Sequence, residues 1–127
     1  MSWREVPRPI RWILGAQIVV LSYGGIVHVV QLATGGWPPY AWAPGWLAAY
    51  FTSLTLLDPL AAALLWSRRA AGLYLSAFVF VTDAAANAYA TYGLHMASGM
   101  AVVSQAVITA IAIAVLVTAR RVRPWLR

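Results

Sequence analysis

Basic residues in this chain are confined to three short stretches, and long apolar stretches lie between them. All nine are arginines, because the chain contains no lysine. In membrane proteins, arginine concentrates in the ends and loops that face the cytoplasm. The pattern therefore predicts a membrane protein with both termini and one loop on the cytoplasmic side. The arginines are Arg4, Arg8 and Arg11; Arg68 and Arg69; and Arg120, Arg121, Arg123 and Arg127.

The composition excludes an ordinary soluble domain. Of the 127 residues, 62% are hydrophobic and 9% are charged, which leaves too few polar side chains to cover a globule. The net charge of +6 lies beside the apolar stretches, where arginine contacts anionic lipid head groups, so we expect no nucleic-acid partner. The absence of cysteine excludes disulfides, thiolate catalysis and Cys-ligated metals. We expect a multi-pass protein of a bacterial inner membrane.

Four apolar segments are long enough to cross a membrane. They cover residues 10–32, 46–66, 70–92 and 100–119, and about 20 residues span a hydrocarbon core of ~30 Å as a helix. In the lipid interior, backbone N–H and C=O groups must form hydrogen bonds within the protein, which favours helices. The sequence thus predicts an all-α, four-helix transmembrane bundle forming one domain over residues 1–127. The connection 33–45 is rich in proline, glycine and aromatic residues, and we expect it to lie on the outer membrane surface as a lid.

Two carboxyl groups lie inside the predicted spans and need an explanation. Counted from the arginines, Asp58 lies about 15 Å, Asp83 about 21 Å and His28 about 25 Å above the inner face. A charged side chain near the middle of the membrane costs between ~3 and ~10 kcal/mol. The aspartates must therefore be protonated, hydrated, hydrogen-bonded to amides or paired with His28. We expect a shared polar cavity in the outer half of the membrane, with Asp58 at its floor.

Helical spacing supports a common inward face for these residues. One stripe in the first span runs through Gln17, Gly24, His28 and Gln31, and stripes of the same kind occur in the third and fourth spans. No metal or cofactor is predicted, because the two histidines lack further ligands at a suitable spacing. The candidate catalytic residues are Asp58, Asp83 and His28, and the candidate ligand-binding residues are Gln31, Asn87, Gln105, Trp37 and Trp42.

A purely structural interpretation remains open for both aspartates. Pro59 removes a backbone donor and frees the carbonyl of Thr55, so a protonated Asp58 could serve as a hydrogen-bonding plug there. Asp83 and Asn87 could join helices, at roughly 0.6–2 kcal/mol per contact.

The first span, with Arg11-Trp12-Ile13-Leu14-Gly15 at its base and His28 and Gln31 near its top, resembles the opening helix of EXPERA-domain membrane proteins. That family includes sterol isomerases of the emopamil-binding type and the sigma-two receptor. The resemblance implies four core helices, cytoplasmic termini, a long first outer connection, a proline-bent second helix and an acid-lined pocket for cationic amphiphiles or sterols. The acids of the family correspond here to Val29 and Leu54, so Asp58 would have to act from a different turn.

The leading functional hypothesis is a cavity that binds a membrane lipid or another small lipophilic molecule. Whether the protein is an enzyme is left open; if it is, proton shuttling as in double-bond isomerisation would suit an aspartate acid and a His28 base. A small proton-coupled or passive transporter is the first alternative, and we expect it to be a homo-oligomer because four short helices seldom enclose a translocation path alone. A non-catalytic membrane assembly partner is the second.

Overall fold

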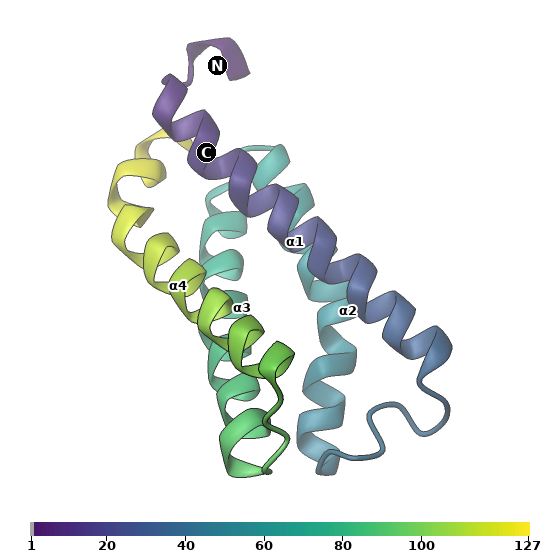
Figure 1. Ribbon diagram of the computed structural model, residues 1–127. Helices are drawn as coiled ribbons and strands as arrows, with labels where there is room; N and C mark the ends of the chain where they lie inside the picture. The colour runs from purple at the N-terminus through teal and green to yellow at the C-terminus, as the bar shows by residue number, and fades with distance from the viewer. Residues whose placement is uncertain (1) are drawn as a thin grey trace.

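The computed structural model describes residues 2–127, and each regular element in that range is helical. Four helices are long and apolar enough to cross a membrane, which confirms the all-α class and the number of candidate spans. Short 3-10 turns at Trp3–Glu5 and Arg123–Trp125 flank them, and a π-helical turn at Tyr89–Gly93 extends the third. The main helices are α1 (Arg8–Thr34), α2 (Gly45–Trp66), α3 (Ala70–Ala88) and α4 (Gly99–Val122), shown in Figure 1.

Local sequence explains where the helices begin and end. Helix α1 stops before Gly35, and Gly36 follows with a φ of +81°, a conformation that glycine adopts without strain. Helix α2 starts directly after Pro44. Helix α4 starts after Ser98, whose Oγ accepts the Ala101 N–H at 3.1 Å as an N-cap. The long connection 35–44 therefore owes its irregular path to its glycines and prolines.

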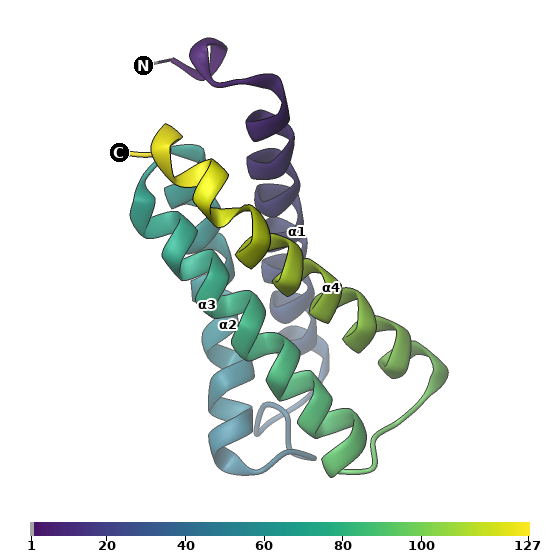
Figure 2. The same ribbon diagram turned by 90° about the vertical axis from the view of Figure 1, so that its left-hand side faces the viewer.

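The helices pack mainly in chain order. Helix α1 packs on α2, α2 on α3 and α3 on α4, whereas α1 and α4 contact each other only sparsely. Helix α4 leans away from α3 toward its own beginning, as Figure 2 shows. The beginning of α4 therefore lies apart from α3 at the end opposite to the chain termini.

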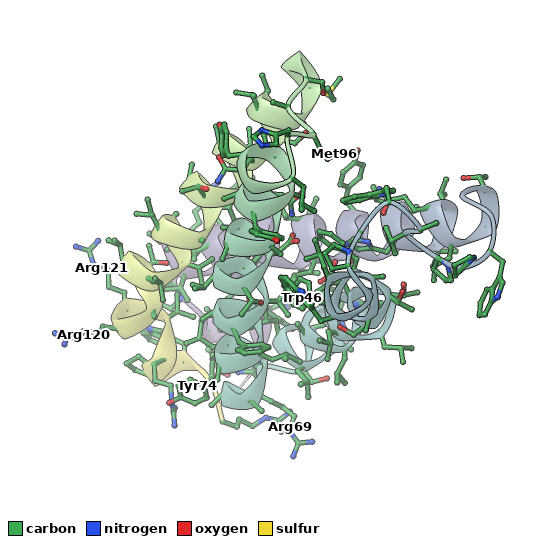
Figure 3. The ribbon with its side chains drawn as sticks, turned by 90° about the horizontal axis from the view of Figure 1, so that it is seen from below. Trp46, Arg69, Tyr74, Met96, Arg120 and Arg121 are labelled. Carbon is green, nitrogen blue, oxygen red and sulfur yellow. The ribbon has the colours of Figure 1, made fainter. Side chains whose placement is uncertain are left out.

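Both termini and the α2–α3 connection meet at the other end of the bundle (Figure 1). The Ala70 N–H donates to the Arg127 carbonyl at 2.7 Å, and the Arg127 N–H donates to the Arg68 carbonyl at 2.8 Å. The indole of Trp3 donates to the Trp66 carbonyl at 3.2 Å. These contacts bring the three arginine-bearing stretches together. Figure 3 shows the side chains of Arg69, Arg120 and Arg121 pointing outward.

Large apolar side chains occur on both the inside and the outside of the bundle. The core is built chiefly from leucines, whose side chains are fully enclosed. Many aromatic and aliphatic residues are exposed, among them Trp12 at 74% and Leu56 at 76%. An apolar exterior of this extent is unusual for a soluble monomer and is compatible with a multi-pass membrane protein. The enclosed leucines are Leu14, Leu21, Leu47, Leu54, Leu65 and Leu73.

Candidate functional site

A cavity of about 600 Å³ lies between the four helices. It brings together His28 of α1, Asp58 of α2 and Asp83 of α3, while the connection 35–44 contributes Tyr40 and Trp42. Helix α4 adds a mostly aliphatic wall. The three residues that the sequence nominated for proton chemistry thus line one space, surrounded mainly by apolar side chains.

Asp58 and His28 face each other across the α1–α2 contact. His28 Nε2 lies 3.9 Å from Asp58 Oδ2, and the side chains are only 12% and 6% exposed. The other carboxyl oxygen, Oδ1, is buried and has no hydrogen-bond partner among residues 2–127. A buried polar atom without a partner is costly. Asp58 Oδ1 is therefore an unsatisfied acceptor buried beside the cavity.

Two glycines allow this close approach of α2 to α1. A Cβ placed on Gly24 would lie 2.5 Å from Asp58 Oδ2, and one placed on Gly25 would lie 3.1 Å from Pro59 Cγ. Both distances are too short for ordinary contact. A side chain at either position would therefore oblige the Asp58 carboxyl or the Pro59 ring to shift, and the Gly24-Gly25 pair lets the Asp58-Pro59 turn lie close to α1.

Asp83 is oriented by its own helix. The Asn87 Nδ2 amide donates to the Asp83 backbone carbonyl at 2.9 Å and to Asp83 Oδ1 at 2.8 Å. These bonds lie within α3, so they do not join two helices as the structural interpretation would require. A separate bond between the hydroxyls of Tyr50 and Thr82, 2.7 Å long, links α2 to α3 beside the site. Asn87 thus fixes one Asp83 oxygen next to the cavity.

The connection 35–44 closes over the cavity through Tyr40. The Tyr40 hydroxyl lies 3.0 Å from His28 Nδ1 and donates to Gln31 Oε1 at 2.8 Å. The rings of Tyr40 and Trp42 pack against Phe51, with centroids 5.4 Å and 6.1 Å away. Burial, and secondarily the charge of Asp83, raise the pKa of Tyr40 above its ordinary value near 10. The phenol is therefore protonated at neutral pH and can donate a hydrogen bond.

The remaining predicted ligand contacts divide into two groups. Gln31, Asn87 and Trp42 line the cavity. The structure does not bring Gln105 and Trp37 to it, as judged over the described part of the chain. Gln105 instead donates to Thr109 Oγ1 at 2.9 Å along α4, and Trp37 is 90% exposed.

Sequence reasoning missed the role of Tyr40 at this site. The residue was expected only as one aromatic of the lid, because a connection rich in proline and glycine has no periodicity that relates it to His28. Its spacing from His28 carries no signal of contact, since the chain turns back between them. Contact of this kind follows from the path of the connection alone.

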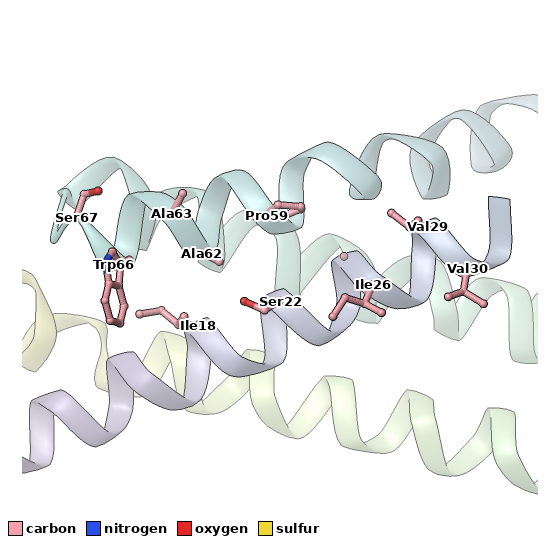
Figure 4. Close-up of a pocket in the computed structure, with 11 residues that line it drawn as sticks. Ile18, Ser22, Ile26, Val29, Val30, Pro59, Ala62, Ala63, Trp66 and Ser67 are labelled. Atoms are coloured by element: carbon pink, nitrogen blue, oxygen red, sulfur yellow. The ribbon is translucent and has the colours of Figure 1, made fainter. Parts of the chain in front are cut away.

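A second hollow lies on the outer side of α1 and α2 (Figure 4). It is an open groove of about 650 Å³, and its lining is apolar apart from Ser22 and Ser67. It runs along Ile18 and Ile26 of α1 and reaches Trp66 at the end of α2. The lining of this groove includes no titratable residue within residues 2–127.

The cavity offers hydrogen-bonding and proton-transferring groups and no ready metal site. Within residues 2–127, no three His, Asp or Glu side chains gather closely enough to hold a metal ion. His95 lies exposed in the connection between the third and fourth helices. Comparison with protein-family models, curated proteins and solved structures gives no match.

Proposed function

We propose that this protein binds a small lipophilic molecule in the cavity between its four helices, with the polar group of the ligand at Asp58, Asp83 and His28. The observation that carries the proposal is the shared cavity: acidic side chains from two helices and an imidazole from a third line one largely apolar space. Pockets for small molecules combine apolar walls with a few placed polar groups. Two carboxyl groups favour a cationic or hydroxylated ligand over an acidic one.

The unused hydrogen-bonding capacity of Asp58 supports a binding role over a plug. If Asp58 served only to fill the hydrogen-bonding gap that Pro59 leaves in α2, both of its carboxyl oxygens would be bonded within that helix. Asp58 Oδ1, however, has no partner within residues 2–127. The carboxyl group of Asp83 also reaches this space. A ligand hydroxyl or ammonium group in the cavity would supply the missing contact once the Asp58 carboxyl turns toward it.

We place the protein in a bacterial inner membrane with both termini on the cytoplasmic side. The gathering of all arginine-bearing stretches at one end of the bundle supports this orientation. The cavity then opens in the outer half of the membrane, beneath the connection 35–44.

The resemblance to EXPERA-domain proteins fits the same proposal with one difference. The positions that correspond to the acids of that family are Val29, which is 52% exposed, and Leu54, which is buried. Asp58 lies one turn beyond Leu54, so the acid of α2 enters the cavity from a lower level. Isomerase-like proton shuttling between Asp58 and His28 is the chemistry we would test first if the ligand is converted.

Ligand binding can be tested with three probes of equal chain length: dodecylamine, dodecanol and dodecanoate. We expect the amine or the alcohol to raise the melting temperature of the purified protein in detergent, and the carboxylate to have no such effect. Asp58→Asn and Asp83→Asn should remove the shift while the unliganded proteins stay folded. Gln105→Ala is the matched control, because Gln105 bonds along α4 outside the cavity, and it should keep the shift.

Other outcomes would favour the alternatives. Proton uptake by proteoliposomes that depends on Asp58 would indicate a transporter. Unfolding of both aspartate variants would support the structural interpretation. Retention of the shift in both aspartate variants would contradict the proposed site.

A further inference from the structure

The imidazole of His28 is held between a phenol on one side and a carboxyl group on the other. Its Nδ1 lies 3.0 Å from the Tyr40 hydroxyl, and its Nε2 lies 3.9 Å from Asp58 Oδ2. A neutral imidazole carries its proton on one nitrogen only, and the neighbour of the other nitrogen decides which. Which nitrogen of neutral His28 carries the proton therefore depends on whether the Tyr40 hydroxyl donates a hydrogen bond to Nδ1 or accepts one from it.

Gln31 determines the direction of the Tyr40 hydrogen bond. The Tyr40 hydroxyl donates to Gln31 Oε1 at 2.8 Å, and an amide oxygen can only accept. The hydroxyl hydrogen is thereby used, and the phenol oxygen is left as an acceptor toward His28. An acceptor facing Nδ1 stabilises the tautomer with the proton on Nδ1.

We propose that Tyr40 is a positioning residue, which together with Gln31 keeps the proton of neutral His28 on Nδ1 and leaves Nε2 as the proton acceptor that faces Asp58. A proton released by the Asp58 carboxyl would then move to Nε2 and give an imidazolium, with the Nδ1–H still bonded to Tyr40. The reverse transfer restores the neutral pair. The use of this acceptor by a ligand rests on the proposed function, whereas the tautomer itself does not.

The inference also links the connection 35–44 to the chemistry of the cavity. Tyr40 lies outside the helices and is anchored by packing on Phe51, whose ring also lies 6.5 Å from that of His28. Displacement of the connection would remove the acceptor from Nδ1. In a displaced state, neutral His28 is expected to shift toward the Nε2–H tautomer, as in Tyr40→Phe.

The test is nitrogen NMR of protein labelled with ¹⁵N-histidine in detergent micelles, with His28→Gln used to assign the His28 and His95 signals. We expect neutral His28 in the unsubstituted protein to be mainly the Nδ1–H form. Tyr40→Phe removes the acceptor and should shift the tautomer ratio toward Nε2–H by roughly three- to tenfold, the effect of one hydrogen bond. Tyr23→Phe is the matched control, since Tyr23 lines the cavity but its described contacts do not include His28, and it should leave the ratio unchanged.

Variants of Gln31 test the direction of the bond independently of Tyr40 removal. Gln31→Leu frees the phenol hydrogen to donate to Nδ1 and should shift the ratio in the same direction as Tyr40→Phe. Gln31→Glu retains an acceptor and should preserve the Nδ1–H form. A predominantly Nε2–H histidine in the unsubstituted protein, or a ratio that neither Tyr40→Phe nor Gln31→Leu changes, would overturn the proposal.

The two proposals fail separately in these measurements. Loss of the dodecylamine and dodecanol shifts with the tautomer result intact would reject the binding function and keep the positioning role. Ligand binding together with a tautomer ratio that the Tyr40 and Gln31 variants do not change would keep the binding function and reject the positioning role.

Discussion

At the scale of single residues, the site depends on glycine, which lets two helices approach closely, as much as on the residues with titratable side chains. Asp58 approaches α1 over Gly24, where a Cβ would lie 2.5 Å from Oδ2. Deeper in the bundle, Ser76 donates to Gln17 Oε1 at 2.7 Å, and the two residues are 0% and 4% exposed. Both features give expectations that can be measured in the unliganded protein.

Gly24→Ala should destabilise the protein and displace the Asp58 carboxyl. The added methyl group overlaps Oδ2, so the carboxyl must turn aside; overpacking of this kind costs about 1–3 kcal/mol, which the better helix propensity of alanine offsets by about 1 kcal/mol. The measurement is the free energy of unfolding in mixed micelles. Gly15→Ala is the control, because nothing lies within 4 Å of its added Cβ, so it should be neutral or slightly stabilising. Equal effects of the two substitutions would show that the α1–α2 approach is looser than described.

Ser76→Ala should lower the free energy of unfolding by about 1 kcal/mol, because it leaves the Gln17 side chain buried without its donor. Gln17 Nε2 already has no partner within residues 2–127. The double variant Gln17→Leu with Ser76→Ala removes both polar groups and should recover much of the loss. A double variant that is less stable than either single one would contradict this account.

At the scale of elements, local chemistry at a helix end also affects the shape of the cavity, since Ser98 caps Ala101 and Ala101 lines the cavity. Helix α4 is the clearest case, because its buried residues, Ala112, Val115 and Val122, all lie in its second half, and its first turn carries the Ser98 cap. The lean of α4 also positions the aliphatic wall of the cavity. Fraying at this end would therefore widen the cavity.

Ser98→Ala should increase amide hydrogen exchange in the first turn of α4, since loss of an N-cap costs roughly 0.5–2 kcal/mol. Ser98→Asp keeps an acceptor oxygen and should preserve the protection. Exchange measured by mass spectrometry should change in the segment 99–103 and stay constant in α2. Unchanged protection in Ser98→Ala would mean that the cap bond does not stabilise this turn.

At the scale of the whole molecule, the arginine-bearing end and the lid-bearing end define an axis. The backbone bonds of Arg127 and Ala70 hold the former together, and Tyr40 with Trp42 covers the latter. Large exposed apolar side chains lie along the helices between the two ends. This distribution favours a molecule that crosses a bilayer along the axis.

Orientation can be measured by single-cysteine labelling, because the chain contains no cysteine. Trp37→Cys lies in the lid connection, and Ser67→Cys lies between α2 and α3. In spheroplasts, a membrane-impermeant maleimide should label Trp37→Cys directly and Ser67→Cys only after lysis. The opposite pattern would reverse the proposed topology.

Hydropathy and charge, which act residue by residue, were sufficient to predict the four helices and the end at which the arginines gather. The two aspartates were nominated because they are carboxyl groups inside apolar spans, and helical periodicity added His28 and placed Asp83 on an inward-facing stripe, since a residue's face on a regular helix follows from its position. Tertiary structure alone decided which of these faces meet. The Gln105 side chain bonds along α4 and does not line the cavity, whereas Tyr40 lines the cavity from a connection without regular secondary structure. Contacts of these two kinds depend on the lean of a helix and on the path of a loop, and neither is encoded in local spacing.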